Sequence, residues 1–431
     1  MIIVDTALEK REQEGKPVRV AIYGAGYMGR GIALHLLDRK PGLRLAGFAS
    51  RKVESAQEAL RTLGAHDFAT VSQVSEFEQA VSRGQVAVTS DPSLLFLAGN
   101  VDVVIDATSD IEFGANLALR SLQHGKHVVL LNAVLDATVG PILKTYADRN
   151  NVVITYIDGD EPGVAVNLFR LVKTFGYKPV AVGNLKGLLD PYRTPETQRA
   201  FAERVKQTPE MITSFADGTK LSMECTILAN ATGLRVGKRG MYGPKCAHVR
   251  EAVGLFPMDK LMNGGIVDFL LGAEPHTGAF VIGYNDHPIK KEYMNFFKMG
   301  DGPLYVFYTP YHLPQVQSLT TIARAALFHD PTAAPLGRPV CDVLTAAKRD
   351  LKAGEVLDGI GGFTCYGVMD NAEVVHQENL LPMGLSEACR LKRDLRKDQP
   401  ITYADVELPV GRLGDQLRSE QAQRFFSSVS A

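Results

Sequence analysis

The feature that most constrains this chain is a glycine-spaced turn between an apolar strand and a helix. Residues 18–33 read VRVAIYGAGYMGRGIA, with the pattern Gly24-x-Gly26-x-x-Gly29 between the two elements. Gly24 permits a tight turn, Gly26 lets a pyrophosphate approach the backbone, and Gly29 lets the helix pack on the strand. The helix N-terminus also offers free N–H groups to phosphate. We therefore expect dinucleotide binding here, with a plain glycine turn as the alternative. The residues expected at this site are Gly24, Gly26, Tyr27, Met28 and Gly29.

Predicted strands alternate with helices over about the first 155 residues. The run 101–107 is almost continuously apolar, which is typical of a central strand in a parallel sheet. Two helical patterns occupy 53–83. This alternation predicts an α/β fold with a doubly wound parallel sheet. The strands expected are 18–23, 43–48, 86–89, 101–107, 127–131 and 152–156.

The pattern changes after Tyr156, where an α+β region is expected. A helix is predicted from about Gly163 to Thr174 and another at about 316–328. Strands are predicted near 179–186, 210–215 and 220–230, with a turn at Asp217-Gly218 between the last two. The pattern changes again beyond Pro331. We expect three domains, at 1–155, 156–332 and 333–431.

The last region contains an internal repeat. Residues 347–357 (AKRDLKAGEVL) resemble residues 391–401 (LKRDLRKDQPI). Each copy has a basic–acidic–apolar run, a turn and the start of an apolar strand. The repeat predicts a duplicated β-element, and a chance match of basic segments is the alternative.

The end of the second strand indicates which cofactor is preferred. A site for NAD usually has an acidic residue there that accepts from the ribose 2′-hydroxyl. This chain has Ser50, Arg51 and Lys52. The two cations would bind a 2′-phosphate, so we expect NADP(H), with NAD(H) as the alternative. An ordinary solvated basic loop is the other interpretation.

Polar and small residues follow the next two strands of the series. Asp106, Ala107 and Thr108 end the strand 101–107, and Asn132 follows the strand 127–131. Loops at the carboxyl ends of parallel strands line the ligand crevice. We expect these four residues to contact the cofactor, although Thr108 could instead cap a helix.

Candidate groups for proton transfer gather in the second region. Lys186 follows an apolar strand in a glycine-flanked loop, where partial desolvation would lower the pKa of its ammonium group. We expect Lys186, Asp160, Glu161, Asp190 and His312 to be the catalytic residues. A surface lysine, a helix-capping acidic pair and an ordinary loop histidine are the alternatives. The wider set of candidates adds Tyr192, Arg193, Glu224, His287 and Tyr311.

Composition excludes several classes of protein. The 431 residues carry a net charge of −1, so no bulk attraction to nucleic acid or anionic membrane is expected. No apolar run approaches the roughly 20 residues that span a bilayer. Five scattered cysteines without a C-x-x-C pair argue against a structural zinc site and favour a reducing compartment. We expect a cytoplasmic protein without a structural metal. A divalent ion bound by Asp160, Glu161 and Glu224 is left open.

The assembled motifs resemble homoserine dehydrogenase-like NAD(P)-dependent oxidoreductases with a C-terminal SAF domain. The nearest branch is the one similar to deoxyxylulose phosphate reductoisomerase. The resemblance covers nearly the whole chain and implies a Rossmann domain, a catalytic domain that also dimerises, and a small β-rich SAF-like domain. The segments that carry it are GKPVRVAIYGAGYMGRGI, VDVVIDAT, GKHVVLLNA, GDEPGVAVNL, FADGTK, ECTILANATGL, GMYGP, GPLYVFYTPYHL and LKRDLRKDQPITYADVEL.

The chain departs from this branch at positions that would bind a phosphorylated substrate. Asn184 replaces a lysine near Lys186, Val134 replaces an acidic residue, and Tyr284 replaces what is often a lysine. With fewer cations, we expect weaker binding of a phosphorylated substrate.

The resulting expectation is an NADP(H)-dependent oxidoreductase that acts on a small polyhydroxylated, phosphorylated or carboxylated carbonyl–alcohol pair. It would form a homodimer or a higher homo-oligomer. The alternatives are a reductoisomerase, a lyase or epimerase that recycles bound cofactor, and a non-catalytic protein that binds cofactor and carbohydrate.

Overall fold

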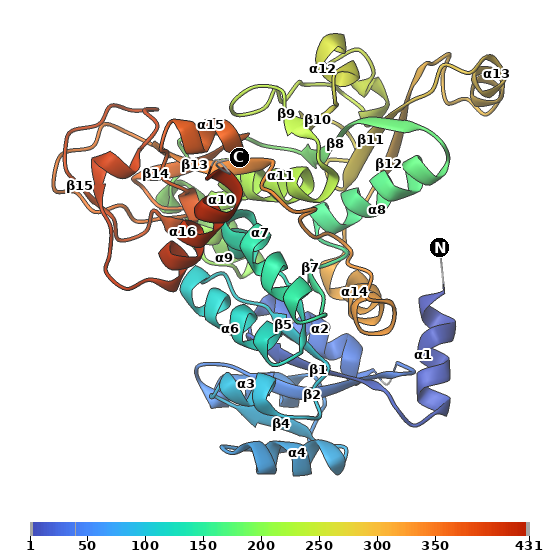
Figure 1. Ribbon diagram of the computed structural model, residues 1–431, viewed down its shortest axis with the longest axis vertical. Helices are drawn as coiled ribbons and strands as arrows, with labels where there is room; N and C mark the ends of the chain where they lie inside the picture. The colour runs from blue at the N-terminus through green and yellow to red at the C-terminus, as the bar shows by residue number, and fades with distance from the viewer. Residues whose placement is uncertain (1–2, 39, 428–431) are drawn as a thin grey trace. The chain divides into compact units, whose positions relative to one another are not determined.

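The computed structural model describes residues 3–38 and 40–427, which form two compact units (Figure 1). Within the described residues, unit 1 spans Met1–Asp136, Ile142–Gly163 and Leu313–Ala334. Unit 2 spans Ala137–Pro141, Val164–His312 and Pro335–Ala431. The C-terminal region thus groups with most of the predicted catalytic region, and the three-domain division stays a prediction.

Unit 1 is built on a seven-stranded parallel sheet with the order β3-β4-β2-β1-β5-β6-β7. The strand order reverses at β1, which lies between β2 and β5. In such sheets, ligands bind outside the carboxyl ends of the strands at this reversal. The predicted α/β class and doubly wound parallel sheet are confirmed. The strands are β1 (Val18–Tyr23), β2 (Leu43–Ala49), β3 (Phe68–Thr70), β4 (Val86–Thr89), β5 (Val103–Asp106), β6 (His127–Leu130) and β7 (Ile154–Tyr156).

Helices cover both faces of this sheet. Ala21 and Tyr23 of β1 belong to a buried cluster that includes Phe77, Leu94 and Leu117 from three helices. The alternate residues of β1 point to the opposite face. The helices are α1 (Val4–Gln13), α2 (Tyr27–Leu37), α3 (Val53–Thr62), α4 (Val74–Ser82), α5 (Ser93–Leu97), α6 (Ile111–Gln123) and α14 (Pro314–Phe328), while α7 (Ala133–Arg149) and α8 (Glu161–Thr174) contain residues of both units.

Unit 2 contains a five-stranded mixed sheet with the order β12-β11-β8-β10-β9. The central strand, β8, pairs in parallel with β10 and antiparallel with β11, and all but its two end residues are buried. The predicted strand near 179–186 is therefore confirmed. The strands are β8 (Lys178–Lys186), β9 (Arg235–Val236), β10 (Ile266–Leu271), β11 (Ala279–Tyr284) and β12 (Leu304–Thr309). The helices are α9 (Pro195–Val205), α10 (Pro209–Ala216), α11 (Thr219–Thr232), η1 (Val249–Ala252), α12 (Met258–Met262) and α13 (Pro288–Phe296).

Two of the predicted strands are wrong, because residues 210–215 and 220–230 lie in helices α10 and α11. Thr208 caps α10 by accepting from the Met211 N–H, and Pro209 occupies the first helical position. Most of α11 is buried, so its sequence lacks the polar stripe of an amphipathic helix. The half-exposed edge strand β3, between α3 and α4, was not predicted because three residues carry little periodicity.

Up to residue 427, the C-terminal part of unit 2 contains two short antiparallel sheets, two α-helices (α) and two short 3-10 helices (η). Its elements are β13 (Cys341–Ala347), β14 (Cys365–Asn371), α15 (Ala372–Gln377), η2 (Met383–Leu385), β15 (Arg390–Leu391), η3 (Tyr403–Asp405), β16 (Val406–Glu407) and α16 (Leu413–Phe426). β13 pairs with β14, and β15 pairs with β16.

Reciprocal hydrogen bonds confirm that the predicted repeat is a duplicated element. Leu351 and Leu395, at the same position of the two copies, donate to each other's carbonyl at 2.9 Å. The Asp350 carboxylate accepts from the Lys397 N–H, and the Asp394 carboxylate accepts from the Ala353 N–H. The same interactions thus occur twice, related by exchange of the copies.

The copies differ at their first lysine. Lys348 is buried and donates to the Asp217 carboxylate at 2.8 Å, to the Arg193 carbonyl at 2.9 Å and to the Gly362 carbonyl at 2.8 Å. Lys392, its counterpart, is exposed. Burial raises the pKa of Asp217, and the Lys348 ammonium group opposes this shift.

We predict that Lys348→Met lowers the free energy of unfolding by about 3–5 kcal/mol, because it leaves the Asp217 carboxylate buried without its cation. Lys392→Met is the matched control and should leave stability within about 0.5 kcal/mol of the wild type. Urea unfolding of both variants measures the difference. Equal effects of the two substitutions would contradict the assignment of Lys348.

Candidate functional site

The glycine loop of unit 1 has the geometry of a phosphate-binding turn. Gly24 has a φ of +117°, and a Cβ there would lie 2.7 Å from the Ala107 carbonyl oxygen. A Cβ on Gly29 would lie 1.8 Å from the Gly24 carbonyl oxygen. A Cβ on Gly26 would meet no atom within 4 Å. Two glycines are therefore required by packing, whereas Gly26 leaves open space beside the start of α2.

The start of α2 is free to receive an anion. Its N-cap is Gly26, so no side chain caps the first N–H groups. Tyr27, the first helical residue, is 58% exposed. Met28 accepts a hydrogen bond at its Sδ from Gln315 of α14. The turn, the open space and the uncapped helix end fit a dinucleotide pyrophosphate.

Three of the polar residues predicted to contact a cofactor bind one another. Asp106 is buried and accepts from the Thr108 hydroxyl at 2.6 Å and from the Asn132 amide at 3.2 Å. Asn132 also caps α7, whereas Asp110 rather than Thr108 caps α6. Burial raises the pKa of Asp106. This network fixes the loop that begins at Ala107, whose carbonyl faces Gly24.

The basic pair after β2 is open to solvent. Ser50 donates its N–H to the Thr89 carbonyl, which aligns the loop with β4. Arg51 and Lys52 are exposed, and within residues 3–38 and 40–427 neither forms an ion pair. Arg51 lies near enough to Tyr23 to oppose the burial that raises the pKa of Tyr23. Both cations are thus available to a ligand.

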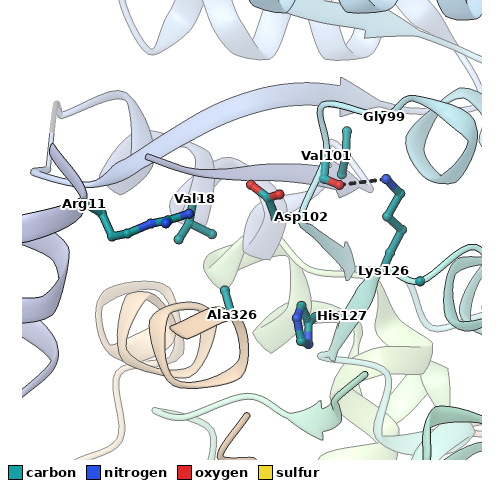
Figure 2. A pocket seen from close by; sticks show the side chains of 9 residues that line it. Arg11, Val18, Gly99, Val101, Asp102, Lys126, His127 and Ala326 are labelled. Atoms are coloured by element: carbon teal, nitrogen blue, oxygen red, sulfur yellow. Dashed lines mark hydrogen bonds between the residues drawn. The ribbon is translucent and has the colours of Figure 1, made fainter. Parts of the chain in front are cut away.

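A pocket of about 300 Å³ lies at the end of the unit 1 sheet opposite the glycine loop (Figure 2). It is lined by the first residues of β1 and β6, Val18 and His127, together with Asp102 and Lys126. Lys126 is buried and donates to the carbonyls of Ala98 and Val101. This pocket lies at the amino ends of β1 and β6, whereas ligands of doubly wound sheets bind at the carboxyl ends. It is therefore separate from the glycine loop.

The main cluster of unit 2 joins two lysines through one buried carboxylate. Glu224 of α11 has a side chain only 3% exposed. Its Oε2 accepts from Lys186 Nζ at 3.2 Å and from the Asn184 amide at 3.1 Å, while its Oε1 lies 3.2 Å from Lys220 Nζ. The lysine side chains are 21% and 18% exposed. One carboxylate thus holds two ammonium groups in place.

Local structure explains this arrangement. Lys186 is the last residue of β8, and Asn184 lies two residues earlier on the same face of the strand. Lys220 and Glu224 are one helical turn apart on α11. Sequence reasoning identified Lys186 and Glu224 and missed Lys220. The i, i+4 spacing would have indicated it only if the segment had been predicted as a helix.

The other predicted catalytic residues belong to other segments of the chain. Asp160 and Glu161 are in unit 1, where Asp160 accepts from the Tyr156 hydroxyl and Glu161 begins α8, 4% exposed. In unit 2, Asp190 accepts from Arg193 Nε at 3.0 Å and from the Tyr192 N–H, so it organises its own turn. His312 Nδ1 lies 2.8 Å from the Thr277 hydroxyl.

No metal-binding group appears among the described residues. Within 3–38 and 40–427, no three His, Cys, Asp or Glu side chains are grouped so that they could hold a metal ion. No helix in the same ranges is both long and apolar enough to cross a membrane.

Two families of oxidoreductases match consecutive parts of the chain. Residues 18–130 match the family described as "Oxidoreductase family, NAD-binding Rossmann fold", and residues 159–318 match "Oxidoreductase DRL, catalytic domain". The chain thus contains a segment that matches an NAD-binding Rossmann fold, followed by a segment that matches an oxidoreductase catalytic domain. The first match contains the glycine loop and the basic pair, and the second contains Lys186, Lys220 and Glu224.

Individual proteins similar to this chain include two homoserine dehydrogenases. The protein of Neisseria gonorrhoeae is 26% identical over 215 residues, which cover 47% of this chain and 44% of that protein. The protein of Pseudomonas aeruginosa is 26% identical over 151 residues, covering 35% of this chain and 31% of that protein. The chain thus spans less than half the length of either relative.

Solved structures to which this chain is similar have low sequence identity to it. A homoserine dehydrogenase from Thiobacillus denitrificans is 13% identical with a TM-score of 0.43, covering 90% of this chain and 98% of that one. The 3-ketoreductase KijD10 from Actinomadura kijaniata, solved with NADP and TDP-benzene, is 14% identical with a TM-score of 0.38, covering 73% and 91%.

Gly26→Ala and Gly29→Ala distinguish the role of the glycine loop in cofactor binding from its role in stability. We predict that Gly26→Ala keeps the thermal midpoint of the wild type but raises the Kd for NADPH about tenfold or more, because its methyl group occupies the space left for pyrophosphate. Gly29→Ala should lower the thermal midpoint as well, because its Cβ clashes with the Gly24 carbonyl. Thermal unfolding and NADPH fluorescence titration measure both effects. Unchanged NADPH binding by Gly26→Ala would contradict the placement of the pyrophosphate.

Proposed function

We propose that this protein is an oxidoreductase that uses NADP(H) to interconvert a carbonyl and an alcohol on a small polyhydroxylated substrate that carries an anionic group. The observation that carries the proposal is the Lys186–Glu224–Lys220 cluster. Its two ammonium groups belong to side chains that are 21% and 18% exposed, so they can bind a reacting oxygen and an anionic group of one small molecule.

Each residue of the cluster has a distinct role in the proposed reaction. Lys186 donates a hydrogen bond and then a proton to the carbonyl oxygen during reduction, and accepts that proton in the reverse direction. Lys220 binds the anionic group or a neighbouring hydroxyl. Glu224 fixes both ammonium groups, and the Asn184 amide donates to the same carboxylate, which orients it. When bound, the nicotinamide cofactor supplies or accepts the hydride.

Unit 1 would hold the cofactor through three features. Gly26 and the uncapped start of α2 accept the pyrophosphate, and the Ala107 loop, held by Asp106, borders the turn. Arg51 and Lys52 bind the 2′-phosphate, which distinguishes NADP(H) from NAD(H). Support for the 2′-phosphate assignment comes from the exposure of both cations and from the absence of an acidic residue at the end of β2.

The anionic group of the substrate could be a carboxylate or a single phosphate. Two similar proteins are named homoserine dehydrogenases, and homoserine is an amino acid with a carboxylate. Lys220 could bind such a carboxylate. Because Asn184 stands where the resembling branch has a lysine, the cluster has one cation fewer for a phosphorylated substrate. We therefore favour a carboxylated substrate over a phosphorylated one.

Lys186→Ala tests the catalytic assignment. We predict that it lowers kcat by about a hundred- to ten-thousand-fold, since it removes the proton donor, and leaves the Kd for NADPH within about twofold. Lys178→Ala, at the other end of β8, is the matched control and should keep wild-type activity. The measurement is NADPH oxidation with carbonyl substrates found in a screen of hydroxy acids, semialdehydes and sugar phosphates. If the wild type binds NADPH tightly but turns over nothing in that screen in either direction, the protein is a cofactor-binding protein instead.

Arg51→Ala tests the cofactor preference. We predict that the Kd for NADPH rises about tenfold, because a charge-assisted contact of about 1.4 kcal/mol is lost, and that the Kd for NADH stays unchanged. Fluorescence titration with the two cofactors measures the difference. Equal losses for both would overturn the 2′-phosphate assignment.

A further inference from the structure

The C-terminal part of unit 2 contacts the helix that carries two members of the lysine cluster. Gly367 of β14 donates its N–H to the Thr219 hydroxyl at 2.8 Å and accepts from the Ser222 hydroxyl at 3.1 Å. Both hydroxyls belong to α11, beside Lys220 and Glu224 in sequence. A Cβ on Gly367 would lie 2.8 Å from a Val343 side-chain carbon, so this close approach needs glycine.

The same C-terminal part also holds the loop that follows Lys186. This loop, residues 187–194, connects β8 to α9. On its buried side, the Asp190 N–H donates to the Ala216 carbonyl and Lys348 donates to the Arg193 carbonyl. On its exposed side, the Tyr192 hydroxyl donates to the Asp398 carboxylate, at 2.9 Å from one oxygen and 3.1 Å from the other.

Asp398 is the centre of a small polar group. Its carboxylate also accepts from the Tyr366 hydroxyl at 3.0 Å. The ammonium nitrogen of Lys397 lies 3.3 Å from the centre of the Tyr192 ring. Two adjacent residues of the second repeat copy therefore contact Tyr192. Asp398 accepts its hydrogen bond, and the cation of Lys397 lies over its ring. We call Asp398, Tyr192 and Tyr366 the Asp398 clamp.

Asp398 has a left-handed backbone conformation. Asp398 has a φ of +65°, a region that residues other than glycine rarely adopt. At the same position of the first copy the chain has Gly354, with a φ of +86°. The fold of the repeat thus favours glycine at this position. An aspartate that replaces it keeps an unfavourable backbone conformation, and such residues concentrate at functional sites.

We propose that Asp398 is a positioning residue, which holds Tyr192 and thereby fixes loop 187–194 behind Lys186. This inference rests on the proposed function, in which Lys186 transfers the proton. The clamp acts through the loop and does not itself touch the reacting atoms. The second repeat copy would in this way support the lysine cluster, while the first copy supports it through Lys348.

Asp398→Gly tests the proposal, because it restores the residue of the other copy. The strained conformation disappears, so the thermal midpoint should stay the same or rise. The Tyr192 hydroxyl loses its acceptor and the loop loses this contact, so kcat/KM should fall about tenfold. Tyr192→Phe should reproduce this fall, with no further loss when the two changes are combined. Asp398→Asn retains one acceptor oxygen and tolerates the same backbone, so it should recover most of the activity.

Tyr366→Phe is the matched control. It removes the other phenol of the clamp, which does not belong to loop 187–194, and should keep wild-type kcat/KM. A fall equal to that of Tyr192→Phe would overturn the proposal, because the effect would then not depend on the loop.

Hydrogen–deuterium exchange of the full chain provides a readout that needs no substrate. We predict that the amides of residues 187–194 exchange about tenfold faster in Asp398→Gly than in the wild type. Unchanged exchange would overturn the clamp, and faster exchange with unchanged kcat/KM would overturn its role in positioning. If the substrate screen finds no turnover by the wild type, the proposed function fails and the positioning role fails with it, while faster exchange would still establish the mechanical contact.

Discussion

The lysine cluster of unit 2 depends on one buried carboxylate. Glu224 lies on a helix that is buried along most of its length, and an unpaired charge there would destabilise the fold by about 3–5 kcal/mol. Lys186, Lys220 and Asn184 satisfy its two oxygens. The same contacts that make the carboxylate tolerable fix two ammonium groups at the end of β8. Stability and the proposed chemistry therefore have a common origin.

The fold of unit 1 could be predicted because its signals are local. The glycine spacing, the apolar strands and the alternation with helices each occupy a few consecutive residues. The same reasoning failed at α11, where burial on all sides removes the amphipathic pattern. That failure concealed Lys220, since its relation to Glu224 is visible only on a helix. The candidate site also needed β8 and α11 to come together, and no local pattern contains that information.

The repeat shows how a duplicated element acquires different roles. Equivalent residues make equivalent contacts at Leu351 and Leu395, and at Asp350 and Asp394. The exceptions are informative, because Lys348 is buried where Lys392 is exposed, and Asp398 replaces Gly354 at a left-handed position. Both exceptions contact the segment from Tyr192 to Asp217. The duplication was predictable from sequence, whereas the pairing of the copies and these differences became visible only through their contacts.

The most direct test of the central claim is a crystal structure of the protein with NADPH and an unreactive analogue of a substrate that it turns over. We predict that the oxygen of the reacting carbon lies within hydrogen-bond distance of Lys186 Nζ, about 2.6–3.2 Å, while Lys220 contacts another polar group of the same molecule. A complex in which the reacting oxygen contacts neither lysine would contradict the proposed role of the cluster.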